Sequence, residues 1–299
     1  EEAEKFLEEF EKKNTYYFQA SKAIDDPAFN KPSNRLSGLS FLLPHELWKV
    51  SYWVVTASLN FLRYSSDYVT QNPFWAVIDK AKRKARVVRG YNDLYDAIEE
   101  EKYIYVPLHT EPEAYPMLLA PYYTDQLWLV KQIARSLPVT FKLYVKDHPV
   151  MVGYRTRAYY RELKKIPNVK LIDVRENSLA LIRKSEMVVT LAGTAGWEAA
   201  LLKKPSIIFG AVFYKYLSGV VRCRAIEDLP ELIRKQLTEY RYDKHELVNF
   251  IAALHEESVD LDLVHLWDVE GGVNVEKRRN ELVPLVDLIA SKVGLNRIA

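Results

Sequence analysis

The middle of the chain alternates short apolar runs with amphipathic segments. The apolar runs predict strands at 103–108, 139–149, 168–173, 186–192 and 205–210. Apolar residues at helical spacing predict helices at 124–137, 156–166, 178–185, 197–203 and 226–240. This alternation with short connections is typical of right-handed βαβ units, and continuous apolar strands indicate helices on both faces of a parallel sheet. We therefore expect a doubly wound, Rossmann-like α/β domain over residues 100–240.

Residues 1–99 lack the alternating strand pattern. They predict helices at 1–13, 45–66 and 74–100, with a long turn-rich loop at 25–38. The first residue is Glu1 instead of an initiator methionine, so a further part of the protein could precede it. We expect a mainly helical N-terminal region, a remnant of an acceptor domain, and a C-terminal helical region at 241–299 that packs back on it.

Two N-terminal segments keep more than one interpretation. The aromatic helix at 45–66 fits a core helix, a subunit contact or a segment lying against a membrane surface. The basic run at 80–89 fits a solvated helix face, or a contact with anionic lipid or a substrate phosphate. Peripheral membrane contact is therefore one of the expected interactions.

Composition narrows the class of protein. The 299 residues include 42 Lys and Arg against 40 Asp and Glu, and this near balance gives no argument for nucleic-acid binding. The single cysteine, Cys223, excludes an internal disulfide and a cysteine-built metal site. It fits a buried structural thiol in a reducing compartment, and so a cytoplasmic protein. No apolar stretch is long enough to span a bilayer.

The strand at 186–192 runs into the turn Gly193-Thr194-Ala195-Gly196 and then directly into a helix. Glycine lets a ligand approach the backbone, and the N–H groups at a helix start bind anions. Thr190 and Thr194 add hydroxyl groups, and Glu198 could accept hydrogen bonds from ribose. Alternatively, the glycines only permit a tight strand-to-helix turn. The turn is neither a Walker loop nor a full GxGxxG.

Two further strand ends carry functional side chains. Lys146, His148 and Pro149 lie where the strand at 139–149 runs into a loop, and Arg155 follows in that loop; the histidine could donate a hydrogen bond to a phosphate. Lys146 could instead be solvated, and a lone histidine is often structural.

A histidine and three carboxylates follow the strand at 103–108. Glu111, Glu113 or Asp125 could act as a base or orient a substrate hydroxyl. Asp125 could equally cap the next helix. The loop at 209–214 could cover a base or sugar, or only the sheet edge. HExxH is absent and the one DxD, at 260–262, lies in an acidic tract, so we expect no bound catalytic metal.

The ordered motifs carry a family resemblance. PLHTEPEA, TDQ, VKDHPVMVGYR, IPNVKLID, VVTLAGTAGWEAALLKKPSIIFG and FY together resemble the capsule polysaccharide biosynthesis proteins, which are GT-B glycosyltransferases related to bacterial Kdo transferases. The likeness covers about residues 100–225. The resemblance implies two Rossmann-like domains facing a cleft, with the donor held mainly by the C-terminal one.

The resemblance also implies chemistry. It implies a cytidine-nucleotide donor such as CMP-Kdo, no cofactor or essential metal, and a growing glycan or glycolipid acceptor at the inner face of the cytoplasmic membrane. On matching positions, His148 and the turn Thr194-Ala195-Gly196 would contact the donor phosphate, and Glu198 would hold the ribose. The missing strand pattern in residues 1–99 departs from the family, so the catalytic base could lie in a part that this sequence does not contain.

Three functions therefore stay open. The first is transfer of a sugar from a nucleotide donor to a surface polysaccharide. The second keeps the fold but performs polyol-phosphate transfer or nucleotide-sugar epimerisation. The third is a nucleotide-binding module without catalytic activity.

Overall fold

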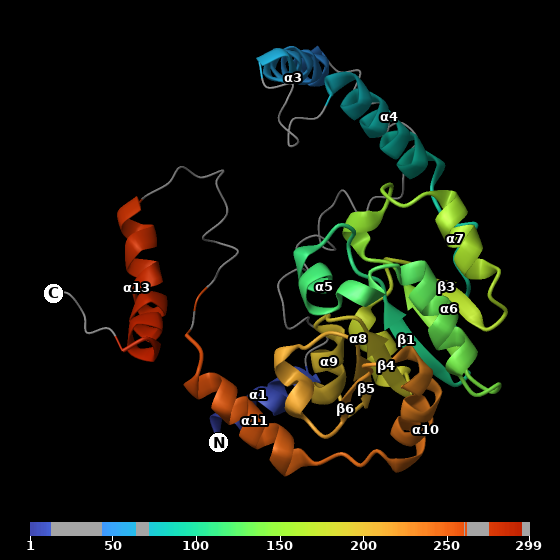
Figure 1. Cartoon of the computed structure of the whole chain (residues 1–299), viewed down its shortest axis with the longest axis vertical. Helices are drawn as coiled ribbons and strands as arrows, with labels where there is room; N and C mark the ends of the chain where they lie inside the picture. Colours follow the sequence, from blue (N-terminus) through green and yellow to red (C-terminus); the bar gives the residue numbers. More distant parts are fainter. Residues whose placement is uncertain (13–43, 64–71, 260, 262–274, 295–299) are drawn as a thin grey trace. The chain divides into compact units, whose positions relative to one another are not determined.

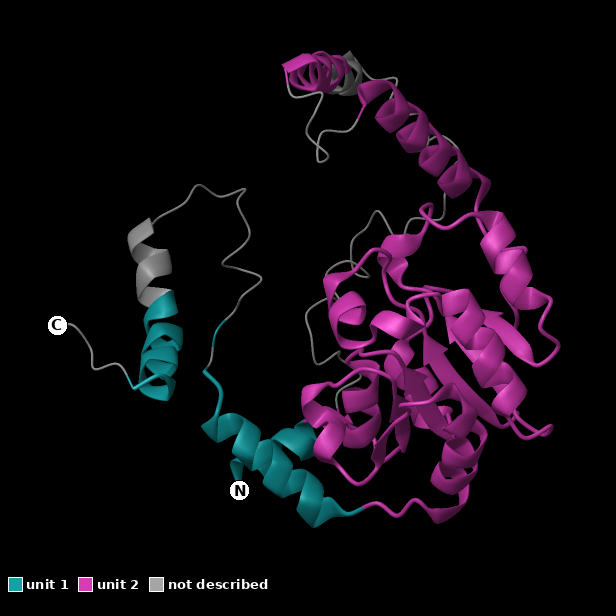
Figure 2. Ribbon diagram, in the orientation of Figure 1, with its two compact units in different colours: residues 1–9, 243–299 teal, residues 10–242 magenta. Residues whose placement is uncertain are grey.

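The computed structural model describes residues 1–12, 44–63, 72–259, 261 and 275–294. Within these ranges the chain divides into two compact units, residues 1–9 with 243–299 and residues 10–242 (Figure 2). The loop expected at 25–38 lies outside the described residues, as do Asp260 and Asp262 of the DxD. The three-part division at 99 and 240 stays a prediction.

The larger unit is built on one six-stranded parallel sheet in the order β3-β2-β1-β4-β5-β6 (Figure 1). All five strand pairs are parallel. The strands are β1 Tyr103–Pro107, β2 Lys142–Lys146, β3 Val169–Ile172, β4 Met187–Thr190, β5 Ser206–Ile208 and β6 Val220–Arg222. The chain order reverses between β1 and β4, which makes this the switch point of a doubly wound sheet.

Helices alternate with the strands as the sequence predicts. The α-helices that follow β1 are α5 Ala114–Leu119, α6 Gln126–Ser136, α7 Arg157–Lys164, α8 Ser178–Lys184, α9 Ala195–Leu201 and α10 Leu229–Glu239. Single 3-10 turns are η3 Pro121–Tyr123, η4 Pro149–Met151, η5 Phe213–Tyr216 and η6 Ile226–Asp228. The expected doubly wound α/β fold with a helical N-terminal region is confirmed.

The two faces of the sheet differ in chemistry. One face is apolar: Ile104, Val106, Leu143 and Val145 join the core cluster with residues of α6, α7 and α10. Since alternate strand residues point to opposite faces, the other face carries a row of buried tyrosines. Tyr103, Tyr105 and Tyr144 lie there. The rings of Tyr103 and Tyr144 stack with centroids 4.0 Å apart, and the Tyr103 hydroxyl donates to Leu181 O of α8 at 2.7 Å.

Three described helices precede β1: α1 Glu2–Lys12, most of which belongs to the smaller unit, and α3 Pro44–Arg63 and α4 Pro73–Arg89 of the larger unit. Asn72 caps α4, and Gly90, with φ 71°, ends it. The helix predicted to continue to residue 100 is therefore wrong beyond Arg89. Residues 91–100 instead run along the edge strand, where Asp96 N–H donates to Leu171 O at 2.8 Å.

The smaller unit contains α11 Lys244–Glu256 and α13 Val275–Lys292. Asp243 caps α11 through the backbone N–H groups of His245 and Glu246. In the larger unit, Cys223 is fully buried, and burial raises the pKa of its thiol to about 11. The expected buried thiol is confirmed. None of the described helices combines the length and apolarity needed to cross a bilayer.

Candidate active site at the carboxyl ends of β1, β2 and β4

The loops that follow β1, β2 and β4 bring most of the predicted site residues together. Pro107 at the end of β1 is in register with Lys146 of β2, and β1 also pairs with β4. The side chains that follow these strands therefore meet at one edge of the sheet, beside the switch point. Ligands of open α/β sheets collect at this edge.

His109 links the loop after β1 to the glycine turn after β4. Its Nε2 lies 3.1 Å from Thr190 Oγ1, which in turn accepts a hydrogen bond from Gly193 N–H at 3.3 Å. A Cβ atom on Gly193 would lie 2.8 Å from His109 Cε1. Position 193 therefore needs glycine because the His109 imidazole occupies the space of a side chain. This packing reason cannot be recognised from the spacing of residues in the sequence.

Gly196 has a similar packing reason. A Cβ atom there would lie 2.5 Å from the hydroxyl oxygen of Tyr214, and this hydroxyl donates to Gly193 O at 2.5 Å. Tyr214 is buried, and its hydroxyl lies against the backbone of the turn. Each glycine of the turn thus leaves room for a side chain of the protein itself, His109 at Gly193 and Tyr214 at Gly196. This agrees with the alternative that the glycines have a structural role in the turn. Thr194 at the helix start is exposed, and Ala195 is partly exposed.

The two carboxylates after β1 already have partners. Glu113 Oε2 accepts a hydrogen bond from Thr110 Oγ1 at 2.7 Å and lies 3.8 Å from His109 Nδ1. The His109 imidazole and the Thr110 hydroxyl hold the pKa of Glu113 below its ordinary value. Glu111 accepts from Gln126 Nε2 and lies 3.2 Å from an Arg155 nitrogen. Both side chains are partly exposed, so a ligand can reach them.

Asp125 stands apart from this cluster. It is exposed and caps α6 by accepting a hydrogen bond from Trp128 N–H at 2.9 Å. This is the capping role that the sequence left open. Gln126, the next residue, is instead buried and exchanges hydrogen bonds with the backbone of His109, at 2.7 and 3.1 Å.

Asp147 is a buried carboxylate with three hydrogen-bond donors around it, and the sequence analysis did not predict it as a site residue. It accepts hydrogen bonds from Arg155, from the Tyr160 hydroxyl at 2.5 Å and from His148 N–H at 2.7 Å. Arg155 also donates to His109 O at 2.7 Å. Arg155, predicted to bind the donor, is therefore buried and held by partners within the protein. Its place in the sequence, eight residues after Asp147, gives no sign of the pairing.

His148 is the side chain best placed to donate to a ligand. Its Nδ1 accepts a hydrogen bond from Val150 N–H at 3.3 Å, because Pro149 begins a 3-10 turn that aims this N–H back at the ring. The neutral imidazole then carries its proton on Nε2, which can donate. Burial lowers the pKa of His148 and so favours this neutral form.

Lys146 and Glu198 are buried titratable groups at the same edge. Lys146 Nζ donates to Ser178 Oγ at 2.8 Å, and burial lowers its pKa to about 8. Glu198 is 5% exposed, and burial raises its pKa to about 7 despite the attraction of Lys146. Perturbed groups of this kind gather at functional sites.

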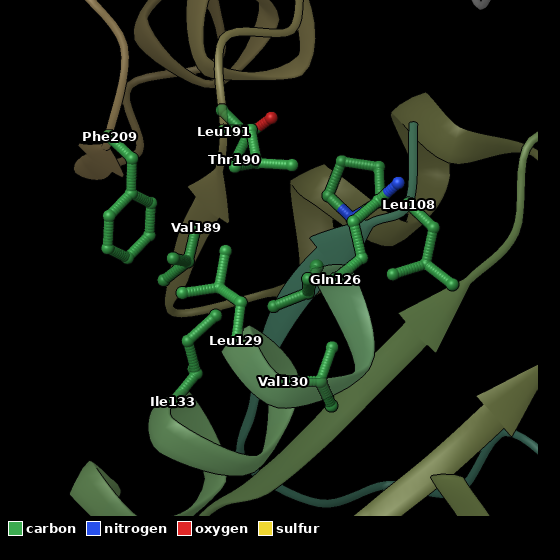
Figure 3. Close-up of a pocket in the computed structure, with 11 residues that line it drawn as sticks. Leu108, Gln126, Leu129, Val130, Ile133, Val189, Thr190, Leu191 and Phe209 are labelled. Carbon is green, nitrogen blue, oxygen red and sulfur yellow. The ribbon is translucent and has the colours of Figure 1, made fainter. Parts of the chain in front are cut away.

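A small cavity lies behind this edge and is too small to be the ligand site. It lies between α6, β1 and β4, and Figure 3 shows Leu129 and Ile133 of α6 beside Val189 of β4. Its volume of about 10 Å³ holds at most a single water. Among the described residues, no group of three or more His, Cys, Asp or Glu could hold a metal ion. Metal independence stays a prediction.

Comparison with known proteins supports the resemblance. Residues 118–236 match the family model described as "Capsule polysaccharide biosynthesis protein". No curated protein matches the chain significantly.

Solved structures that match include two structures of KpsC from Thermosulfurimonas dismutans. The β-Kdo 2,4-transferase is 22% identical, with 55% of this chain and 46% of that chain covered and a TM-score of 0.36. The β-Kdo 2,7-transferase is 21% identical, with 67% of each chain covered and a TM-score of 0.36.

A UDP-GlcNAc 2-epimerase from Methanocaldococcus jannaschii is 16% identical, with 60% of this chain and 54% of that chain covered and a TM-score of 0.38. The chain thus spans about half of the first of these structures. At such TM-scores the likenesses carry no statement about activity. The family match covers the sheet from β2 to β6, with His148 and the glycine turn inside it. The resemblance to the capsule polysaccharide biosynthesis proteins is therefore confirmed over residues 118–236.

Proposed function

We propose that the chain is the donor-binding part of a GT-B glycosyltransferase that builds a capsule or surface polysaccharide. The observation that carries the proposal is the position of His148. It lies in the segment that matches the capsule family, at the ligand-binding edge of the sheet, with a proton-bearing Nε2 that no described residue accepts from. An N–H group at this edge can donate a hydrogen bond to the phosphate of a nucleotide sugar.

The reaction needs charge stabilisation at the leaving phosphate. The acceptor hydroxyl attacks the anomeric carbon of the donor, and the bond from that carbon to the phosphate oxygen breaks. Negative charge then grows on the nucleotide phosphate, where the N–H of His148 and the turn at 194–196 would stabilise it. Positioning of donor and acceptor supplies much of the remaining rate.

The acceptor hydroxyl must also lose a proton. Glu111 and Glu113 are the partly exposed carboxylates near His148 and are our candidates for the base. Glu198, with a pKa of about 7, has a proton affinity better matched to neutral pH, but it is more deeply buried. In this proposal Glu198 holds the ribose, and Lys146 lies beside it.

By the sequence resemblance, the donor is CMP-linked with a Kdo-like sugar, and the acceptor is a glycan or glycolipid. Metal independence and a cytoplasmic location at the inner membrane face are parts of the same proposal. Polyol-phosphate transfer, epimerisation and binding without turnover are the alternatives that experiment must separate.

Calorimetric titration with CMP, CDP, UMP, UDP, GDP and ADP tests the proposal. We expect a selective response to CMP, and His148→Ala should weaken it by about tenfold or more at unchanged unfolding temperature. His245→Ala, which removes an exposed histidine of α11, is the matched control. Equal losses of stability and binding would make His148 structural.

Product analysis then separates the chemical alternatives. Incubation with CMP-Kdo and a glycan acceptor should release CMP and lengthen the glycan. Phosphate in the product would indicate polyol-phosphate transfer, and sugar conversion without an acceptor would indicate epimerisation. If none of the six nucleotides gives a binding signal in calorimetry, the proposal for this chain is overturned.

A further inference from the structure

Helix α4 has two faces with different tasks. One face holds the helix to the loop after β2: Arg86 donates to the carbonyl oxygens of Gly153 at 2.8 Å and Tyr154 at 2.9 Å, and the Arg83 guanidinium lies 3.9 Å from the centre of the Tyr154 ring. The remaining surface of the helix has no buried residue. The helix is thus anchored along one side and exposed along the other.

The exposed side of α4 is apolar along its centre and basic at its margins. At 3.6 residues per turn, one apolar stripe contains Phe74, Val77, Ile78, Ala81, Ala85 and Val88. Lys80 and Lys84 flank this stripe on one side, and Lys82 and Arg89 flank it on the other. All four basic side chains are exposed. Lys80 Nζ lies 3.7 Å from the centre of the Trp53 ring of α3, and the long stems of the other three can reach past the apolar stripe to charges beyond it.

Helix α3 carries a second exposed apolar stripe. The spacings of four and three residues place its members on one face, and each is between 56% and 77% exposed: Trp48, Tyr52, Val55, Leu59 and Leu62. At the start of α4, Phe74 and Trp75 are 69% and 65% exposed. A contiguous set of large aromatic and aliphatic side chains in water is costly and marks an interaction surface.

The net charge of α4 distinguishes between the partners that could cover this surface. Helix α4 contains six basic residues and one acidic residue, a net charge of +5 in a chain whose total is +2. The rest of the chain is therefore net negative, and the positive charge is concentrated beside the apolar stripes. A second copy that paired through the same surface would bring like charges together, and a nucleic acid would leave the apolar stripes uncovered.

We propose that α3 and α4 bind the surface of an anionic phospholipid bilayer. The apolar stripes enter the boundary between headgroups and acyl chains, the Trp, Tyr and Phe rings lie at headgroup level, and the four flanking basic side chains contact lipid phosphates. The helices lie on the bilayer and do not cross it. This inference is independent of the reaction assigned to the domain.

Vesicle co-sedimentation of the full chain tests the proposal. We expect the protein to pellet with vesicles of phosphatidylcholine and phosphatidylglycerol at low salt, and to stay in solution with phosphatidylcholine alone. High salt should release it, because screening weakens attraction to the anionic surface. Equal binding to both vesicles, or to neither, would overturn the proposal.

Two matched pairs of variants locate the binding surface. The first pair replaces four exposed basic residues by Gln, either in α4 or elsewhere on the larger unit. The α4 set is Lys80, Lys82, Lys84 and Arg89, and the control set is Lys102, Arg135, Arg161 and Lys184. The α4 set should weaken binding by about tenfold or more, and the control set should weaken it much less.

The second pair replaces exposed apolar residues by Ser. The test set is Trp48, Leu59, Leu62 and Phe74, and the control set is Leu118, Tyr122, Val139 and Tyr216. Only the test set should reduce binding, with the circular dichroism spectrum and unfolding temperature unchanged. Equal losses in test and control sets would overturn the proposed surface. A dimer in lipid-free sedimentation that the test set dissociates would assign the stripes to a second copy instead.

Discussion

Replacing Gly196 by alanine tests why α9 needs a glycine at this position. The added Cβ atom would lie 2.5 Å from the Tyr214 hydroxyl oxygen and 2.9 Å from its Cε2. Tyr214 is 1% exposed and its hydroxyl donates to Gly193 O, so its ring has little room to withdraw. Overpacking a closed core costs about 1–3 kcal/mol. Alanine recovers up to about 1 kcal/mol through helix propensity.

We therefore expect Gly196→Ala to lower the free energy of unfolding by about 1–2 kcal/mol, measured by urea denaturation. Tyr214→Phe alone should cost about 1 kcal/mol through the lost hydrogen bond. The double variant should cost less than the sum, because the closest atom is gone. Wild-type stability together with lost nucleotide binding would refute this reasoning and show that the ligand, not Tyr214, requires the glycine.

Three further predictions concern buried or capping carboxylates. Glu198 has a folded pKa of about 7 against an ordinary value of 4.5, so the folded chain binds more protons than the unfolded chain and stability should fall as pH rises from about 4.5 to 7. Glu198→Gln should flatten this slope in urea denaturation, and an unchanged slope would contradict the assignment. Asp147→Asn should cost up to about 3–5 kcal/mol because it leaves the buried Arg155 only the partly exposed Glu111 as an ion-pair partner; a loss below about 1 kcal/mol in the same assay would count against that role. Asp125→Ala should cost about 0.5–2 kcal/mol through the lost cap and leave CMP affinity unchanged in calorimetry, whereas lost sugar transfer at full stability would make Asp125 catalytic.

The sheet was predictable because its strands are buried on both faces and so appear as continuous apolar runs. Val220–Arg222 was not, since this edge strand is buried only at Val220 and so shows no continuous apolar run. The helix predicted to reach residue 100 failed for a different reason. Tyr91 and Leu94 have helical spacing, but they lie in a non-helical segment that runs along β3. Both are buried in the core, and this burial depends on the tertiary fold and not on the local sequence.

The candidate site was predictable in its location and less so in its internal contacts. Polar residues at the strand ends were predicted to meet at one edge of the sheet, and the structure brings most of them together there, including His148 and the glycine turn. The pairing of Asp147 with Arg155 and the contact of His109 with Gly193 arise only when separate loops meet. Linear spacing carries no information on such contacts.

The tyrosine-lined face of the sheet sets an alkaline limit for the fold. Burial raises the pKa of both Tyr103 and Tyr144, whereas in the unfolded chain their phenols ionise near pH 10. Above that pH the unfolded chain loses protons that the folded chain retains, so stability falls as pH rises. Alkaline unfolding should therefore coincide with a rise in phenolate absorbance beyond that of the exposed tyrosines, because these two phenols stay protonated until the fold opens.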